Sequence, residues 1–130
     1  MPNPAISLSS LPGTFAVCRL AAGDPVPAWA LEGRFFSVTR TPAELSVVCP
    51  QENVPAGVVS EMVWRAFQVA GVLDFSLTGI LHSILQPLTQ AGISIFAVST
   101  YNTDYILVKE DRLEAAVHAL VEAGFRVTMY

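Results

Sequence analysis

The chain has 130 residues, which fits one compact domain or two very small units that share a core. Hydrophobic residues make up 52% of it and charged residues 14%, against about 25% in an average soluble domain, so the composition excludes a disordered chain. Seven basic and eleven acidic residues give a net charge of −4 without any Lys/Arg cluster, which excludes a nucleic-acid binder that relies on charge.

Neither membrane insertion nor secretion is expected. Apolar stretches such as Val69–Leu73 and Leu77–Leu81 are interrupted by polar residues and fall short of the roughly 18 residues of a membrane-spanning helix. The N-terminal sequence Met-Pro-Asn-Pro has neither the basic nor the continuous apolar region of a signal peptide. We therefore expect a cytoplasmic protein, whose low charge indicates surface covered in a homodimer or a higher homo-oligomer.

The first half, residues 1–62, predicts strands and little helix. Strands are expected at Thr14–Leu20 and Phe35–Thr39, followed by a further strand that contains Val48. The segment Asp24–Gly33 holds two prolines and has room for one or two helical turns, and Pro50–Pro55 stands where a second helix would be.

Cys18 and Cys49 each end an apolar run in this half. Without a secretory signal, we expect both to be buried thiols rather than a disulfide. His82 and His118 show no metal-ligand spacing with either cysteine, so neither a metal site nor a cofactor is expected.

The second half, residues 63–130, predicts strands and helices in the order βαββαβ. A first helix with Ser76 as its N-cap is expected to end at Gly92. A second helix is expected from Asp111 as N-cap, with Glu114 completing a capping box, up to Gly124. The strands expected around these helices are Val63–Ala70, Ile93–Ser99, Asp104–Lys109 and Phe125–Tyr130. The fold class is therefore α+β and ferredoxin-like, with two helices covering one face of a four-stranded antiparallel sheet.

The two halves resemble each other when they are aligned without a gap. Three positions are then identical, namely Phe36 with Phe96, Val38 with Val98 and Val48 with Val108. We interpret this as an internal duplication in which residues 1–62 form a degenerate, helix-poor copy of the module at residues 63–130. The alternative is a chance match between two pairs of apolar strands.

Several segments of the second half resemble an ACT domain, the βαββαβ amino-acid-sensing module of aspartate kinases and other biosynthetic regulators. These segments are Ala91–Thr100, Tyr105–Val108 and Leu113–Leu120. The strings Leu73–Leu81 and Ser99–Tyr105 are similar to small stand-alone tandem-ACT proteins of bacteria, which are in turn similar to the ACT repeats of CASTOR-type arginine sensors. The resemblance covers about Trp64–Tyr130 and rests on element order and on two polar loops.

The resemblance implies a non-catalytic regulatory protein that binds a free amino acid. In ACT proteins the ligand lies where the loop before the first helix of one module meets the second strand of another, so a site at a module or subunit interface is expected. Binding would change how the protein associates with itself or with a regulated protein partner. The implied ligand-binding residues are Asp74, Phe75, Ser76, Leu77, Thr78, Gly79, Ser99, Thr100, Tyr101, Asn102, Thr103 and Asp104.

The chemistry of these residues suits an amino acid. Backbone N–H groups at a helix start favour a carboxylate, and Gly79 would let a ligand approach the backbone closely. Asp74 and Asp104 can accept hydrogen bonds from an ammonium or a cationic side chain. A basic amino acid is therefore slightly favoured, while apolar amino acids remain open because Phe75 and Phe96 are near in sequence.

Other interpretations fit the same residues. Asp74 and Ser76 are equally suited to capping a helix, and Asp104 to closing a turn. The protein could be a structural oligomerisation module without a ligand. It could also be a small ferredoxin-like enzyme in which Asp104 or Asp74 acts with His82. Since the sequence has no nucleophile elbow, phosphate loop or metal-ligand spacing, we do not expect an enzyme.

Overall fold

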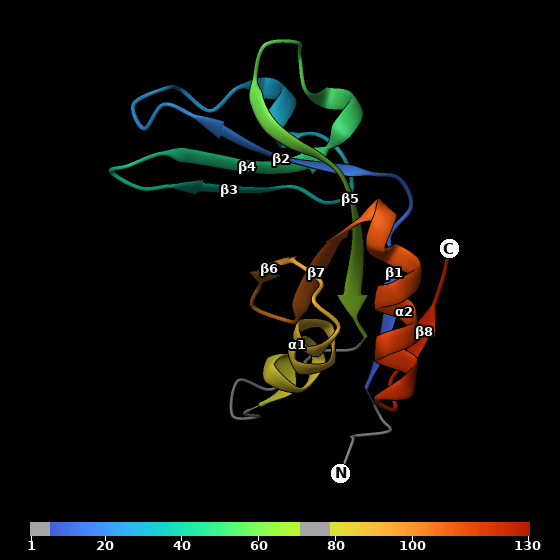
Figure 1. Cartoon of the computed structure of the whole chain (residues 1–130). Coiled ribbons are helices and arrows are strands. Elements are labelled where there is room, and N and C mark those ends of the chain that lie inside the picture. The colour runs from blue at the N-terminus through green and yellow to red at the C-terminus, as the bar shows by residue number, and fades with distance from the viewer. Residues whose placement is uncertain (1–5, 71–78) are drawn as a thin grey trace. The chain divides into compact units, whose positions relative to one another are not determined.

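The computed structural model describes residues 6–70 and 79–130 (Figure 1). The chain divides into two compact units. The N-terminal unit is Gly13–Trp64, and the C-terminal unit combines Met1–Pro12 with Arg65–Tyr130. This division differs from the expected one because the first twelve residues go with the C-terminal unit. In the described part of the chain, no helix is both long and apolar enough to cross a membrane.

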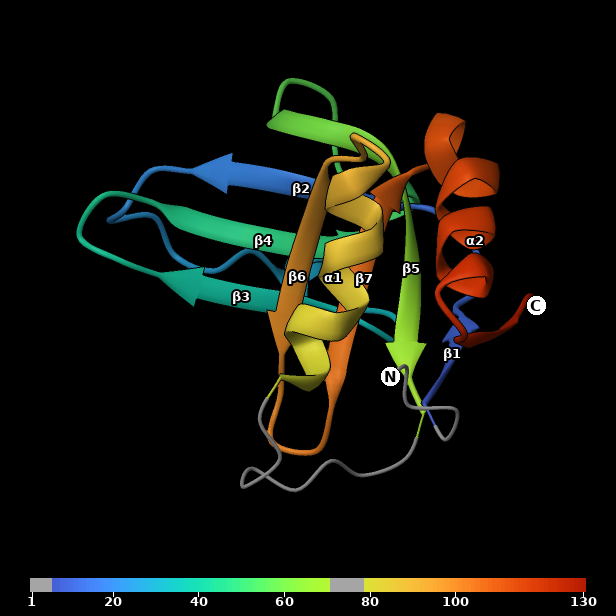
Figure 2. The ribbon, with the colours of Figure 1, turned by 60° about the horizontal axis from the view of Figure 1, so that its bottom comes forward.

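The C-terminal unit has the expected βαββαβ order, which confirms the ferredoxin-like fold. Its helices are α1 (Ile80–Gln90) and α2 (Leu113–Glu122), the latter preceded by a 3-10 turn, η3 (Glu110–Arg112). Its strands are the second part of β5 (Val59–Val69), then β6 (Ile95–Ser99), β7 (Asp104–Lys109) and β8 (Arg126–Thr128). Both helices lie on the same side of the sheet (Figure 2).

The expected four-stranded antiparallel sheet is wrong in one respect. A further strand, β1 (Ser7–Ser10), lies between β5 and β8, so the order is β6-β7-β5-β1-β8. β1 is antiparallel to β5 and parallel to β8. Leu8 pairs with Val69 on one side and Val127 on the other and is fully buried. A short, serine-rich segment joins the sheet because its apolar residues complete the core.

A single core holds the C-terminal unit together. Three strands and both helices contribute fully or almost fully buried side chains, namely Leu8 from β1, Phe67 from β5, Ile84 and Leu88 from α1, Ile106 and Val108 from β7, and Ala116 and Leu120 from α2. Strands β6 and β8 add the partly buried Ile95 and Val127. The spacing of the helical members is the spacing that predicted both helices. The helices form because this face removes apolar surface from water against the sheet.

Both helices end as the sequence predicts. Gly92 and Gly124 adopt positive φ angles of 73° and 98°. The amide of Gly92 donates to Thr89 O and that of Ile93 to Leu88 O, both at 3.0 Å. Gly124 and Phe125 repeat the pattern at the end of α2. These paired bonds are Schellman motifs, and the left-handed glycine makes each of them favourable.

The predicted helix starts are wrong. The N-cap of α1 is Gly79 with φ 82°, instead of Ser76, which lies outside the described residues. The N-cap of α2 is Arg112, without a side-chain hydrogen bond, so Asp111 and Glu114 form no capping box. The chain enters η3 directly after β7, and this places Asp111 inside a helical turn, where an acidic side chain still complements the helix dipole.

The N-terminal unit repeats the element order with 3-10 turns in place of helices. Its elements are β2 (Phe15–Leu20), η1 (Ala28–Leu31), β3 (Ser37–Arg40), β4 (Leu45–Pro50), η2 (Gln51–Asn53) and the first part of β5. The strand order β3-β4-β2-β5 matches β6-β7-β5-β8 of the C-terminal unit once β1 is set aside. The two units therefore share the same order of strands in the sheet, although the N-terminal unit has few helical residues.

The alignment between the repeats is shifted by one residue from the expected one. Val38 pairs with Val47 in β3 and β4, and Ala97 pairs with Ile106 in β6 and β7. Ile106 and Val47 both face the helix-side cores, and they stand 59 residues apart rather than the 60 of the sequence match. Since neighbouring strand residues point to opposite faces, the match of Val48 with Val108 joins residues on different faces.

Cys18 and Cys49 are buried free thiols, as predicted. They lie on the neighbouring strands β2 and β4 within one small core cluster. Burial raises the pKa of Cys49 to about 12, with further contributions from Cys18 and Glu52, and burial also raises the pKa of Cys18. Both thiols therefore stay protonated at neutral pH and are poor nucleophiles and poor metal ligands.

Candidate functional site

The structure describes about half of the expected ligand-binding residues. Gly79 and the stretch Ser99–Asp104 are described, whereas Asp74, Phe75, Ser76, Leu77 and Thr78 lie outside the described residues. The described part belongs to one end of the C-terminal unit, where β6 turns into β7 and α1 begins.

The turn between β6 and β7 is closed by its own threonines. The amide of Thr100 donates to Thr103 O at 2.8 Å, and the Thr100 hydroxyl donates to the same oxygen at 3.0 Å. The amide of Thr103 donates back to Thr100 Oγ1 at 3.2 Å. These bonds fix the backbone of the turn without help from a ligand.

Thr103 ties this turn to the end of β5. It is 6% exposed, and its hydroxyl donates to the carbonyl of Val69 at 2.7 Å. Val69 is the last residue of β5, from which the chain continues toward α1. The Thr103 hydroxyl therefore positions the turn, and the sequence gives little sign of this because its partner lies 34 residues away.

Asp104 is held in place by Ser99. The two residues are cross-strand partners, and the Ser99 hydroxyl donates to Asp104 Oδ1 at 2.5 Å. Asp104 has the same parity along β7 as the core residues Ile106 and Val108, so it lies on the helix-covered face of the sheet. It is partly buried, which places a fixed carboxylate at the end of the core face nearest the turn.

The tip of the turn is open. Tyr101 is 81% exposed, and Asn102 is exposed as well. Both side chains are therefore accessible to solvent. Tyr105 is only partly buried and, by its parity along β7, lies on the opposite face from Asp104.

The start of α1 forms the second described part of the site. The φ angle of Gly79 is 82°, a left-handed conformation that favours glycine. No heavy atom lies within 4 Å of the position that a Cβ would take there. The first intrahelical bond runs from Ser83 N to Gly79 O at 2.9 Å, so the amides of Ile80, Leu81 and His82 have no partner within the helix. Figure 2 shows the start of α1, the end of β5 and the β6–β7 turn at the same end of the unit.

These features together suit a zwitterion. Helix N-terminal amides attract a carboxylate, and the fixed Asp104 carboxylate attracts an ammonium or guanidinium group. Catalytic chemistry has less support, because His82 is exposed and, in the part of the chain described here, forms no hydrogen bond with a carboxylate. The described residues also contain no group of His, Cys, Asp and Glu side chains that could hold a metal ion.

The fold and its site define the class of ferredoxin-like modules that carry a polar turn beside the start of the first helix. The family model of the ACT domain matches residues 59–122, and a separate model of an N-terminal domain matches residues 13–57. The C-terminal half of the chain, over residues 59–122, therefore belongs to the ACT-domain family.

Known proteins share the sequence or the fold. The human cytosolic arginine sensor for mTORC1 subunit 1 is 32% identical over 100 residues, which are 68% of this chain. The chain spans about 30% of the length of that relative. A solved protein from Agrobacterium tumefaciens is 39% identical with a TM-score of 0.93, over 98% of this chain and 96% of that chain. The regulatory subunit of aspartate kinase from Thermus thermophilus shares the fold at 12% identity, with a TM-score of 0.60 over 95% and 99% of the two chains.

Proposed function

We propose that this protein is a non-catalytic regulatory protein that binds a free amino acid at the end of its C-terminal unit. The observation that carries the proposal is the bond between Thr103 and Val69, because it joins the polar turn to the strand end that leads into α1. Family membership supports the proposal, as does similarity to a protein named as an arginine sensor and to a regulatory subunit of aspartate kinase.

The ligand that these groups favour is a basic amino acid. Its α-carboxylate would bind the amides at the start of α1, and its cationic groups would bind Asp104. Asp74 lies outside the described residues and remains a candidate for a second acidic contact. We further propose that Ser99, Thr100, Tyr101 and Asn102 provide polar contacts around the ligand, as the resemblance to ACT domains implies.

A second chain would enclose the ligand at this site. Ser99, Thr100, Tyr101 and Asn102 are all exposed, whereas ligand pockets bury about 70–90% of a small ligand. We therefore propose that ligand binding is coupled to homo-oligomerisation, and that a regulated protein partner responds to the assembled form. The match to a protein named as cytosolic supports a cytoplasmic location for this assembly.

The deciding experiment is a thermal-shift screen of the full chain against the standard amino acids at millimolar concentrations. A ligand at 100 times its dissociation constant stabilises the folded state by about 2.7 kcal/mol. For a chain of this size, that raises the melting midpoint by several degrees. A shift with one amino acid or a small chemical group of them supports the sensor. Unchanged midpoints with every amino acid would contradict it and favour a structural oligomerisation module.

A further inference from the structure

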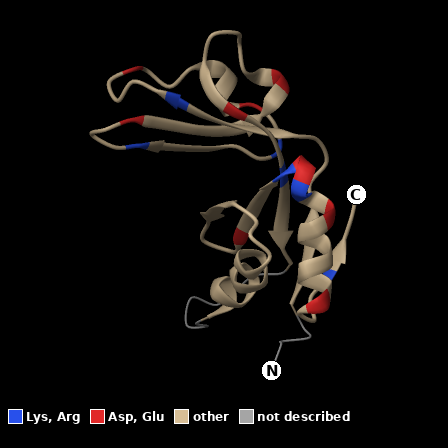
Figure 3. Cartoon of the chain, viewed as in Figure 1, with Lys and Arg blue, Asp and Glu red and all other residues tan. Residues whose placement is uncertain are grey.

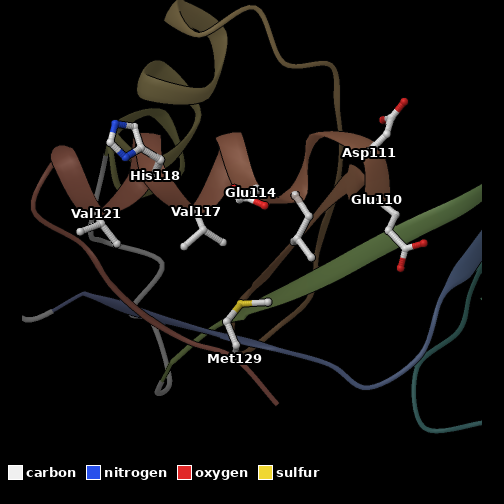
Figure 4. A pocket seen from close by; sticks show the side chains of 8 residues that line it. Glu110, Asp111, Glu114, Val117, His118, Val121 and Met129 are labelled. Carbon is white, nitrogen blue, oxygen red and sulfur yellow. The ribbon is translucent and has the colours of Figure 1, made fainter.

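A second surface of the C-terminal unit has the features of a docking site. A groove of about 650 Å³ runs between α2 and the segment that follows β8 (Figure 4). We call it the α2 groove and define it by three acidic residues, Glu110, Asp111 and Glu114, and by three apolar ones, Val117, Val121 and Met129. It shares no residue with the candidate amino-acid site.

The apolar half of the groove is a second stripe on α2. Ala116 and Leu120 of this helix face the core, whereas Val117 and Val121, four residues apart, line the groove. Val121 is 54% exposed and Met129 44% exposed, which is unusual for side chains of this size when they lie together. Figure 4 shows Val117 and Val121 pointing to the side on which Met129 lies.

The opposite wall of the groove is fixed to the sheet. The amide of Tyr130 donates at 2.7 Å to the hydroxyl of Ser10, which is 4% exposed and belongs to β1. This bond holds the backbone next to Met129 against a strand in the middle of the sheet. The groove is therefore held in shape on both sides, by helix α2 on one and by the bond between Tyr130 and Ser10 on the other.

The other half of the groove is acidic. Glu110 contacts Arg65 at 3.4 Å, but within the described residues Asp111 and Glu114 form no ion pair. No lysine or arginine lines the groove, and His118, which also lines it, contacts Glu122 at 3.6 Å. Figure 3 shows acidic and basic residues next to each other at the start of α2. The groove thus joins a negative end to an apolar end.

We propose that the α2 groove docks a cationic, aliphatic segment of another protein. Lysine or arginine side chains of that segment bind at Glu110, Asp111 and Glu114, and its aliphatic side chains pack on Val117, Val121 and Met129. The lining runs over two turns of α2, about 11 Å, which suits a short peptide segment better than a compact metabolite. A second copy of this chain would bring the same negative surface in a two-fold contact, so charge favours a different protein.

The test uses the full chain and a defined probe. The probe is a 14-residue capped peptide of leucine and lysine with helical spacing, and its counterpart carries glutamate in place of lysine. Binding is followed by methyl NMR at low and at moderate salt. We expect the lysine peptide to shift the methyl signals of Val117, Val121 and Met129, with an affinity that falls as salt is added. The glutamate peptide should bind at least tenfold more weakly.

Matched variants separate the groove from general attraction to an acidic protein. The double variant Asp111→Asn with Glu114→Gln should weaken binding at least fivefold, and Val121→Lys should abolish it. Glu122→Gln removes one negative charge from the same helix at a residue outside the groove lining, and it should leave the affinity unchanged. All of these residues are exposed, so the melting midpoints of the variants should remain close to that of the parent chain.

Several results would overturn the proposal. These are equal weakening by Glu122→Gln, methyl shifts elsewhere than in the groove, or tight binding of the glutamate peptide. Sedimentation showing a dimer that Val121→Lys dissociates would assign the groove to a second copy instead. The amino-acid screen reads a different site, so its outcome is independent of this one.

Discussion

At the scale of single residues, the candidate site depends on how Asp104 is held. Its hydrogen bond with Ser99 orients the carboxylate, and Thr103 sets the position of the turn from which it projects. The polar run Ser99–Asp104 was predictable because it interrupts an apolar sequence. The role of Thr103 was not, because its bonding partner is a backbone carbonyl on another strand.

Replacing Asp104 by asparagine keeps the shape of the side chain and removes its charge. We expect the affinity for the amino acid that gives the largest thermal shift to fall at least tenfold, because a charge-assisted hydrogen bond contributes about 1.5–3 kcal/mol. Asp111→Asn, at the other end of α2 from this turn, is the control and should leave the affinity unchanged. Isothermal titration calorimetry measures both. Equal affinities of Asp104→Asn and the parent would remove Asp104 from the site.

Because of Cys49, the free energy of unfolding should depend on pH in the alkaline range. Burial raises its pKa in the folded state from the ordinary 9.0 to about 12, so the unfolded chain loses this proton first. Its contribution to stability is present below about pH 9 and is lost as pH rises toward 12, by at most about 1.4 kcal/mol per pH unit. We expect the free energy of unfolding in urea to fall more steeply over this range in the parent chain than in Cys49→Ala. Parallel curves would show that the thiol is not shielded.

At the scale of elements, helix ends were predicted better than helix starts. Gly92 and Gly124 are visible in the sequence because only glycine readily takes the left-handed conformation at a helix end. The starts depend on the preceding chain, since η3 follows β7 without a break and takes Asp111 into a turn. The capping prediction failed because it was based on residue types alone, whereas the position of a helix start also depends on the conformation of the preceding backbone.

A pair of glycine variants tests this argument. Gly92 has φ 73° and Gly23 has no left-handed φ, and neither has an atom within 4 Å of where a Cβ would lie. Gly92→Ala should therefore destabilise the protein by about 1–2 kcal/mol through backbone strain alone. Gly23→Ala should be neutral or stabilise it by up to about 1 kcal/mol, because the unfolded chain loses freedom. Thermal denaturation distinguishes them, and a loss of the same size in both would contradict the explanation.

At the scale of the whole molecule, the two structural units do not coincide with the two halves of the sequence. β1 comes first in the chain but completes the sheet of the C-terminal unit between β5 and β8. A module of residues 63–130 alone would lack this strand and would leave two sheet edges unpaired. The N-terminal segment is therefore a structural part of the unit that carries the candidate site.

Leu8→Ala measures how much β1 contributes. Leu8 is fully buried in the core of the C-terminal unit, so we expect a loss of about 2–5 kcal/mol in the free energy of unfolding. Leu31→Ala, at a leucine that is 51% exposed, is the matched control and should change stability by much less. Chemical denaturation of the two variants gives the comparison. A small effect at Leu8 would mean that the N-terminal segment is dispensable.

The sequence by itself determined the element order, the two glycine helix ends, the buried thiols and the polar turn that carries half of the candidate site. Each of these features depends on the spacing of residues close together in the sequence or on a single residue type, so it can be recognised without the tertiary structure. Only the tertiary structure decided the insertion of β1, the one-residue shift between the repeats and the bond from Thr103 to Val69. These features depend on which strands pair and in which register, and that choice is made by the burial of side chains far apart in the chain.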